Sequence, residues 1–564
     1  MPGVRYPTDP HRLRDDTSAP LGVSMGVASG LDPDPDTVRH APGRRVPVPV
    51  NALTGIIAVA AALGAGELVA AFISPESSPY FAVGSSVVDH SPLWMREWAI
   101  STFGTSDKLA LFVVMGVVIA ILAGVCGVAE RRRPPIGSIV IVVFAIVGVV
   151  ASLGRPGASA TYMLPSLFAG AAGVIALRIL VGILDADAET ARAQTAPSED
   201  SDDSPGVLHA PASRRFVLTA AGIAAAAVAV GALGRTLLAG AAKTIADRNA
   251  LRLPAPASPA PPVPASADIG VPGATPFVTG NADFYRIDTA LQVPQLTTGD
   301  WQLRVHGMVD NEFTLSWDDL LAMPMTERLV TLTCVSNEVG GDLIGNARWL
   351  GVRMKDLLDR AGVRPGANML YSTSSDGWTC GTPVSAITDN RDALLAIGMN
   401  GQPLPVEHGY PVRQVIPGLY GYVSATKWVV DWELTSFDKA QAYWTSRGWS
   451  QLGPIKISSR IDRPSSSDLP AGQVVLAGTS WHQHTGIAGV EVRIDDGPWE
   501  QATLATDYSD DTWRPWKYVW QAGAGQHTVT CRAIGKDGQV QTSATADPVP
   551  DGATGLDSRT YSIS

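Results

Sequence analysis

The chain has 564 residues and a formal net charge of −11 at pH 7, and 46% of its residues are hydrophobic. This length exceeds one ordinary domain, and an acidic balance without a basic, aromatic-rich patch argues against a nucleic-acid partner. The four cysteines, Cys126, Cys334, Cys380 and Cys531, form no C-x-x-C pair. This spacing indicates neither a zinc site nor a disulfide framework, although a bridge between Cys334 and Cys380 stays open.

The first half of the chain contains long apolar runs of the kind that cross membranes. A helix of about 20 mostly apolar residues spans a hydrocarbon layer about 30 Å thick. Runs of this length cover residues 52–73, 109–128, 136–153, 164–184 and, in an alanine-rich form, 216–233. We therefore predict a multi-pass protein of the cytoplasmic membrane, in contact with lipid.

The positions of the arginines predict the orientation. Arginines precede the first run at positions 44–45, fill a short loop at 131–133, and precede the fifth run at Arg214 and Arg215. Because positively charged loops stay in the cytoplasm, five crossings place everything after about residue 240 outside. Residues 213–218 also resemble a twin-arginine export signal, which serves proteins that fold around a cofactor before export.

Two linkers separate the apolar runs from the globular half. Residues 185–204 have too little apolar content to bury, which predicts a disordered cytoplasmic linker. The proline-rich residues 254–264 predict a stiff spacer that holds the globular part clear of the membrane. The predicted organisation is a polar tail (1–51), a four-helix transmembrane region (52–184), an acidic linker (185–212), a fifth transmembrane helix (213–240), a Pro/Ala-rich linker (241–276), a catalytic domain (277–463) and a C-terminal domain (464–564).

The globular half predicts two kinds of domain. Residues 277–463 combine helices and strands, and we expect an α+β domain. Its helices should begin after the N-cap Ser316 and cover 352–361. Its strands are expected at 368–373, 393–399, 414–417 and 428–434, with a tight turn at 399–402. From residue 464 onward, short alternating segments and a hairpin turn at 495–497 predict an all-β, immunoglobulin-like sandwich.

Cys334 is the residue of the globular half best placed for chemistry. It ends an alternating run that starts at Leu329 and passes into a polar, glycine-containing loop, so it should lie at the tip of a strand. A thiol there is a candidate soft metal ligand or nucleophile, and the alternative is a small, buried, inert cysteine. Basic residues suited to an anionic, phosphate-bearing cofactor occur at Arg286, Arg348, His408, Arg413 and Lys427.

The order of a cysteine, Arg-Trp-x-Gly at 348–351 and His-Gly-x-Pro-x-Arg at 408–413 resembles the molybdopterin domain of the sulfite oxidase family. The following sandwich is similar to that family's dimerisation domain, which implies a homodimer. The resemblance implies that Cys334 is the protein thiolate on a molybdenum that one molybdopterin also binds. It implies that Arg286 reaches toward the substrate oxygen atoms; the alternative is an ion pair with Asp288. The implied pterin-binding and phosphate-binding residues are Asn337, Arg348, His408, Arg413 and Lys427.

Two positions depart from the sulfite oxidase pattern. The family has a further arginine after the cysteine, where this chain has Glu338 and Val339, and a tyrosine where this chain has Ser446. If Glu338 and Val339 face the pocket, the lost cation and the added carboxylate weaken the binding of a dianion such as sulfite. The resemblance therefore implies the molybdenum site but not sulfite as the substrate.

We expect a membrane-anchored molybdenum oxidoreductase that transfers an oxygen atom to or from a small substrate outside the cytoplasm. The predicted membrane helices contain no histidine to hold a haem, so the electron partner should be external, a quinone or a cytochrome. The alternatives are an S-oxide or N-oxide reductase of the same fold and a non-catalytic exported protein for binding or assembly. Structural roles are predicted for the remaining candidates, Glu67, His482, His484, His527 and Cys531.

Overall fold

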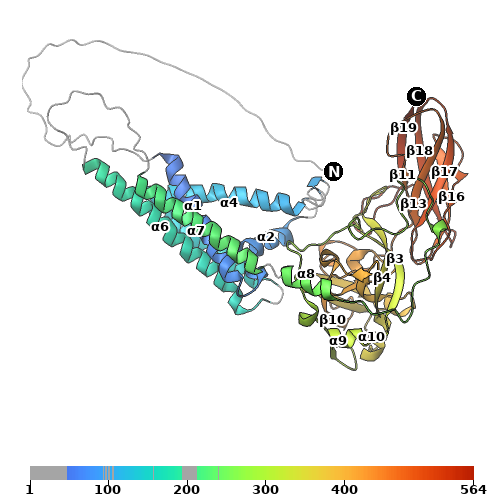
Figure 1. The fold of residues 1–564 in the computed structure, drawn as a ribbon, viewed down its shortest axis with the longest axis horizontal. Helices are drawn as coiled ribbons and strands as arrows, with labels where there is room; N and C mark the ends of the chain where they lie inside the picture. Colours follow the sequence, from blue (N-terminus) through green and yellow to red (C-terminus); the bar gives the residue numbers. More distant parts are fainter. Residues whose placement is uncertain are drawn as a thin grey trace, which may run out of the picture.

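The computed structural model describes residues 47–92, 95, 98, 102–103, 107–155, 158–193, 213–238 and 241–564. Most of the predicted N-terminal tail and residues 194–212 of the acidic linker lie outside the described residues. Figure 1 shows three parts: a bundle of long helices, a mixed part of helices and strands beside one end of the bundle, and a C-terminal part built from strands.

Five helices of the described chain are long and apolar enough to cross a membrane, which agrees with the sequence prediction. They are α1 (Val48–Ala70), α4 (Asp107–Arg132), α5 (Ile136–Leu153), α6 (Leu164–Ala193) and α7 (Arg214–Leu238). Exposed side chains recur every four residues along α4 at Val117, Ile121 and Val125, the pattern of a lipid-facing surface. On its inner side α4 meets α1 at Gly55, where an added Cβ would lie 1.8 Å from the carbonyl oxygen of Ala123.

The two ends of the bundle have different neighbours. At one end Arg131 donates hydrogen bonds to Asn51 at 2.9 Å and to Asp185 at 3.1 Å, so the arginine-rich loop and the start of α1 lie together. At the other end the carboxylate of Asp89 accepts a hydrogen bond from Tyr443 of the mixed part at 2.9 Å. Helix α2 (Pro79–His90), which the sequence did not predict, lies at this second end (Figure 1).

The mixed part contains two β-sheets. One has the strand order β2-β1-β10-β5-β6, and the other has the order β3-β4-β7-β8 with β9 paired to β7. The strands of the first are β1 (Gln302–Gly307), β2 (Phe313–Ser316), β5 (Met369–Ser374), β6 (Thr379–Pro383) and β10 (Val429–Thr435). Those of the second are β3 (Thr326–Thr333), β4 (Ile344–Arg353), β7 (Leu394–Met399), β8 (Gln402–Pro403) and β9 (Arg413–Val415). The predicted strands of this region are confirmed within two residues.

Three helices connect these strands: α9 (Trp317–Leu321), α10 (Met354–Ala361) and α11 (Ser385–Thr388). The predicted N-cap Ser316 forms a capping box with Asp319, which satisfies two backbone donors at the start of α9. Helix α10 buries one face on the core and ends at Gly362, whose φ of +67° is the left-handed conformation that favours glycine. Both predicted helices are therefore confirmed.

The proline-rich linker packs against the mixed part, so the prediction of a free spacer was wrong. Ala257 donates a backbone hydrogen bond to Met325 at 2.8 Å, and Ala260 is buried in the core. Proline-rich backbone is already extended, so it lies along β3 at little entropic cost. Helix α8 (Ala241–Ala250) precedes it and is anchored where the Tyr410 hydroxyl donates to Asp247 at 2.7 Å.

The acidic linker also begins later than predicted. Helix α6 continues to Ala193, so residues 185–193 are helical. Asp185 pairs with Arg131, and Ser213 donates a hydrogen bond to Asp187. These contacts tie the polar extension of α6 to neighbouring segments, which composition alone does not reveal.

The C-terminal part consists of two sheets that share one apolar core. The first has the order β11-β13-β17-β16 and the second β12-β19-β18-β14-β15. Their strands are β11 (Ser458–Arg463), β12 (Asp468–Leu469), β13 (Gly472–Trp481), β14 (Ile487–Ile494), β15 (Glu500–Gln501), β16 (Thr503–Leu504), β17 (Arg514–Ala522), β18 (Gly525–Gly535) and β19 (Ser558–Ile563). Cys531 is buried in this core, as predicted. The predicted hairpin at 495–497 joins β14 to β15, whose residues Val492 and Glu500 are paired.

Candidate active site

Cys334 directly follows the last residue of β3 and continues the strand face of Val330 and Leu332. These two side chains pack with Trp349 in one core cluster, whereas the hydroxyl of Thr331 bonds Trp513 of the C-terminal part. Because successive strand residues point to opposite faces, Cys334 lies on the face of Trp349. All four cysteines are free, so no bridge joins Cys334 to Cys380. Burial raises the pKa of the Cys334 thiol, although contacts with Ser336 and Val335 lower it.

Two tyrosines lie close to this thiol. Burial, followed by the charge of Cys334, raises the pKa of Tyr285, and the same two causes contribute to a pKa of about 12 for Tyr420. An added Cβ at Gly421 would lie 3.9 Å from both the Tyr285 hydroxyl and the carbonyl oxygen of Thr333. The loop that carries Gly421 therefore runs beside the end of β3, and its missing side chain leaves room near the thiol.

Arg413 is a buried cation without an anionic partner. The residue is 5% exposed, and no carboxylate of the described residues lies within 4.0 Å of its guanidinium. The guanidinium donates to the carbonyl oxygens of His408 at 3.0 Å and Gln414 at 3.3 Å and lies 4.9 Å from the Trp349 ring centroid. Burial lowers its pKa to about 10. Buried charges are normally paired, so this arrangement is suited to an anionic ligand.

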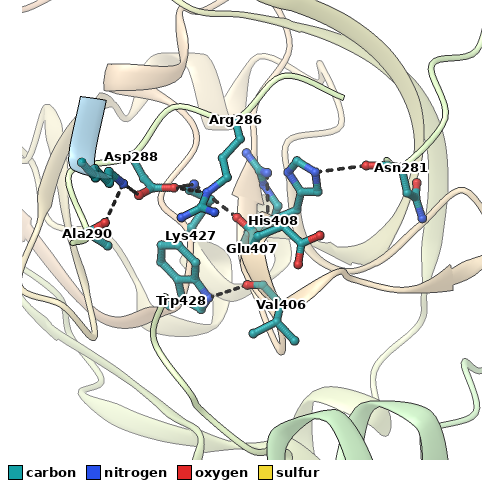
Figure 2. Close-up of polar contacts among 11 residues, drawn as sticks. Asn281, Arg286, Asp288, Ala290, Val406, Glu407, His408, Lys427 and Trp428 are labelled. Carbon is teal, nitrogen blue, oxygen red and sulfur yellow. Dashed lines mark hydrogen bonds and ion pairs between the residues drawn. The ribbon is translucent and has the colours of Figure 1, made fainter. Parts of the chain in front are cut away.

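Asp288 gathers three cations. Its carboxylate lies 2.7 Å from Lys427, 2.8 Å from Arg286 and 2.5 Å from Lys108, and Figure 2 shows the side chains of Arg286 and Lys427 directed at it. Burial alone would raise the pKa of Asp288, but the three cations hold it below its usual range. Burial also lowers the pKa of Lys427 to about 8, against the influence of Asp288. The cluster keeps a net positive charge because Asp288 is its only carboxylate among the described contacts.

The backbone around Lys427 has an unusual conformation. Trp428 has a φ of +51°, which is rare for a large side chain, and its indole nitrogen donates to the carbonyl oxygen of Val406 at 2.9 Å (Figure 2). Arg413 and Lys427 form an isolated antiparallel bridge. Gly409 has a φ of +111°, and an added Cβ would lie 3.0 Å from the Arg413 Cβ and 3.2 Å from the Lys427 Cα. These constraints hold the two cations side by side.

His408 and Asn337 occupy the edges of the same region. The His408 ring bonds the carbonyl oxygen of Asn281 at 3.2 Å and packs edge-on against Phe284. Burial and the nearby Arg413 lower the pKa of His408 to about 3, so the ring is neutral at physiological pH. The side-chain amide oxygen of Asn337 accepts a hydrogen bond from the backbone N–H of Leu343 at 2.8 Å, which fixes the loop that follows Cys334.

Arg348 is not brought to this cluster. It is the neighbour of Trp349 in β4, so its side chain points to the opposite face of the sheet. There it pairs with Glu327 at 2.8 Å and acts electrostatically on Tyr508 of the C-terminal part. The sequence motif places Arg348 beside Trp349, but it does not show that their side chains point to opposite faces of the sheet.

The structure also shows the surroundings of the residues that depart from the family pattern. Glu338 is exposed, and Val339 lies against the C-terminal part, 3.3 Å from the position of an added Cβ on Gly555. Ser446 donates to the carbonyl oxygen of Tyr443 at 2.9 Å. Of the other candidates, His484 pairs with Asp511 at 3.1 Å, and no group of three or more potential metal ligands occurs among the described residues.

The sequence did not predict two residues of the candidate site, Lys108 and Tyr285. Lys108 directly precedes the predicted apolar run 109–128 and is far from the other residues in the sequence, so no local signal identifies it. Tyr285 directly precedes Arg286, but a tyrosine beside an arginine is too common to single out. Asp288 was considered only as the alternative partner of Arg286, and the structure confirms that pair while burying the carboxylate, which is 5% exposed.

Comparisons with known proteins add independent findings. Residues 290–444 match the family model described as an oxidoreductase molybdopterin binding domain. The chain is 34% identical over 169 residues to the uncharacterized oxidoreductase YuiH of Bacillus subtilis (strain 168), which covers 28% of this chain and 82% of that protein.

A second relative is the mitochondrial sulfite oxidase of Rattus norvegicus, 28% identical over 320 residues and 48% of this chain. The chain spans 58% of the length of that relative. Among solved structures, the sulfane dehydrogenase SoxCD from Paracoccus pantotrophus is similar with a TM-score of 0.45 and 21% identity, covering 51% of this chain and 84% of that chain.

Proposed function

Because the chain belongs to the sulfite oxidase family of molybdopterin-dependent oxidoreductases, we propose that it transfers an oxygen atom to or from a small substrate. Family membership implies an enzyme that uses molybdenum with molybdopterin. The residues around Cys334 fit this cofactor, and the buried, unpaired guanidinium of Arg413 is the observation that carries the assignment. A phosphate-bearing ligand would supply the missing anion.

Cys334 would be the protein ligand of the metal, since a thiolate is a soft, anionic donor. Arg413 and Lys427 would bind the phosphate, with His408 and Asn337 at the edges of the pterin. When bound, the cofactor supplies two-electron redox chemistry and an exchangeable oxygen site.

The chain's own residues would position the substrate. Arg286 is 35% exposed while its guanidinium is held by Asp288, so it can offer its remaining donors to a substrate oxygen. The ring of His408, neutral because its pKa is low, offers a hydrogen bond without adding charge. The buried Asp288 fixes Arg286 and Lys427 relative to each other, which reduces the reorganisation needed during turnover.

We place the catalytic domain on the extracytoplasmic side of the cytoplasmic membrane. The arginine-rich end of the bundle, marked by Arg131, lies at the opposite end from the catalytic part, which supports this orientation. Arg214 and Arg215 would act as the export signal at the start of α7. The C-terminal sheets would form an immunoglobulin-like sandwich that mediates homodimer formation, and the electron partner would be a quinone or a cytochrome.

A second candidate function is the reduction of S-oxides or N-oxides. Arg286 is neutralised in part by Asp288 at 2.8 Å, and the position of the additional family arginine is taken by Val339 at the C-terminal part. The first observation favours a neutral oxo substrate over a dianion, whereas the second carries no weight because Val339 lies against the C-terminal part. A non-catalytic role in binding or assembly would leave the buried Arg413 charge without an explanation.

Metal analysis and a substrate screen on the exported, full-length protein test the proposal. About one molybdenum per chain is expected, together with either sulfite oxidation or methionine sulfoxide reduction coupled to a soluble dye. Properly exported protein that binds no molybdenum would refute the enzyme. Sulfite turnover without S-oxide turnover would reject the second candidate, and the reverse result would favour it.

A further inference from the structure

A cavity of about 670 Å³ lies between the helical bundle and the mixed part. We call it the interface cavity. One wall consists of the segments that follow α1 and α5 together with helix α2, and the other of residues 289–296 and 375–378 with Tyr443 and Arg447. Because the first wall starts at the ends of apolar helices, the cavity lies at the level expected for the membrane surface. Its volume is in the range of small-molecule sites.

Buried polar atoms without partners line this cavity. They are Oε1 of Gln295, Oγ of Ser375 and Nε of Arg447, and no hydrogen-bond partner is found for them among the described residues. Buried donors and acceptors are normally satisfied, so these atoms require a ligand or water. They supply an amide oxygen as acceptor, a guanidinium as donor and a hydroxyl that can do both. Apolar side chains such as Phe81, Leu291 and Trp378 complete the wall.

Glu76 brings a carboxylate to the same cavity, from the short helix Pro75–Ser77 after α1. Burial raises the pKa of Glu76 to about 7, and Asp376 adds to the rise while Arg155 opposes it. No cation lies within 4.0 Å of this carboxylate among the described residues. The group is therefore suited to proton exchange near neutral pH. The other titratable side chains at the cavity are Asp89, His90, Tyr443 and Arg447.

The walls of the cavity are tied together and connected to the candidate active site. Asp89 accepts from Arg155 at 3.1 Å and from Tyr443 at 2.9 Å, which joins the bundle to the mixed part. On the inner side, Thr289 and Ala290 line the cavity and directly follow Asp288. Two residues span at most about 7 Å, so the cavity lies beside the cationic cluster.

On the basis of the proposed function, we propose that the interface cavity binds the headgroup of a membrane quinone, with Glu76 as its proton-exchanging group. Oxygen-atom transfer needs a two-electron partner, and a quinone reaches this cavity from the membrane. In the oxidising direction, water supplies the oxygen atom, and the quinone takes up two electrons and two protons to become a quinol. In the reducing direction, the quinol gives back the two electrons and the two protons, and the oxygen removed from the substrate leaves as water.

Two assays on the full-length holoenzyme separate this site from the catalytic one. Turnover with a soluble dye reports the catalytic site alone, and turnover with decylubiquinone or its quinol requires the interface cavity. Gln295→Leu is expected to raise the KM for the decylubiquinone couple at least tenfold while dye-coupled turnover and the substrate KM change less than twofold. Gln501→Leu, at an exposed position of β15, is the matched control and should change neither.

The pH dependence of quinone-coupled turnover tests the role of the Glu76 carboxylate. Glu76→Gln should abolish the inflection near pH 7 in quinone-coupled turnover and leave the dye-coupled profile unchanged. Glu312→Gln, whose side chain is 58% exposed, should leave both profiles unchanged. An unaltered quinone-coupled profile in Glu76→Gln would remove this residue from the proposal.

Photolabelling gives a readout that does not depend on turnover. An azidoquinone should label residues 289–296 or 375–378, with competition by decylubiquinone. Labelling displaced by phospholipid alone, or no labelling there, overturns the quinone site even if the enzyme is active. A higher substrate KM in the dye assay of Gln295→Leu would assign the cavity to the substrate instead. Loss of all dye-coupled turnover in the wild type would refute the proposed function while labelling still tests the cavity.

Discussion

Lys108, the second residue of helix α4, lies 2.5 Å from the carboxylate of Asp288 in the mixed part. The same ammonium donates to the carbonyl oxygen of Ala290 at 2.5 Å. A residue at the start of α4, directly before the predicted apolar run 109–128, thus completes the charge cluster beside the candidate active site. The helical part therefore contributes a residue to this cluster.

Substitution of Lys108 by Met should lower kcat/KM about tenfold. Asp288 would lose one of its three cations, its pKa would rise toward the usual range, and Arg286 would lose its fixed position. A hydrogen bond between charged groups contributes about 1.5–3 kcal/mol, which is of this order. The control is Lys243→Met, because Lys243 is 70% exposed and pairs with the exposed Asp300. Equal effects of the two substitutions in the dye assay would contradict a specific role of Lys108.

Substitution of Cys334 by Ser should reduce turnover by about three orders of magnitude and leave the fold intact. A hydroxyl is a harder and more basic ligand than a thiolate, so the electronic structure of the metal should change. The cost in unfolding free energy should stay below about 1 kcal/mol, since the side chain is only partly buried. Electron paramagnetic resonance of the reduced protein measures this change in the electronic structure of the metal. Cys380→Ser, at a fully buried thiol, should do the opposite by lowering stability and preserving the spectrum.

Substitution of Arg413 by Met should have opposite effects with and without cofactor. In the cofactor-free protein the buried guanidinium has no anionic partner, so its removal should leave the thermal unfolding midpoint unchanged or raise it. In protein expressed with cofactor, the same variant should retain less than about one tenth of the molybdenum, given the strength of charge-assisted phosphate contacts. Destabilisation of the cofactor-free form together with full metal content would show that Arg413 is structural.

The His408→Gln variant should be destabilised less by acidic pH than the wild type. The folded-state pKa of His408 is about 3, below the usual 6.5, so the native state binds fewer protons than the unfolded state between these values. The stability contributed by the neutral ring is present above about pH 6.5 and declines as the pH falls toward 3, by about 2 kcal/mol at pH 5. Thermal unfolding of the cofactor-free protein at pH 7.5 and pH 5 measures this. The Gln variant should lose less stability over that interval than the wild type.

Much of the architecture was readable from local pattern. The apolar runs predicted the five long helices, because length and composition suffice to predict a helix that can cross a membrane. Helix α5 matches its predicted range of 136–153. The N-cap Ser316 and the turn at Asn400 and Gly401 were predictable because capping and positive φ depend on a few neighbouring residues. Helices α2 and α8 were missed, since neither is long and apolar and each is held by contacts with distant residues.

The sequence alone determined the family resemblance, the cysteine and the cationic character of the site, because these follow from residue types in a fixed order. Tertiary structure decided which cations meet. Arg348 and Trp349 are adjacent in the chain but lie on opposite faces of a sheet, whereas Lys108 and Asp288 are 180 residues apart and 2.5 Å from each other. Strand alternation and the docking of a helix end on another domain set these distances, and neither leaves a signal at the residues concerned.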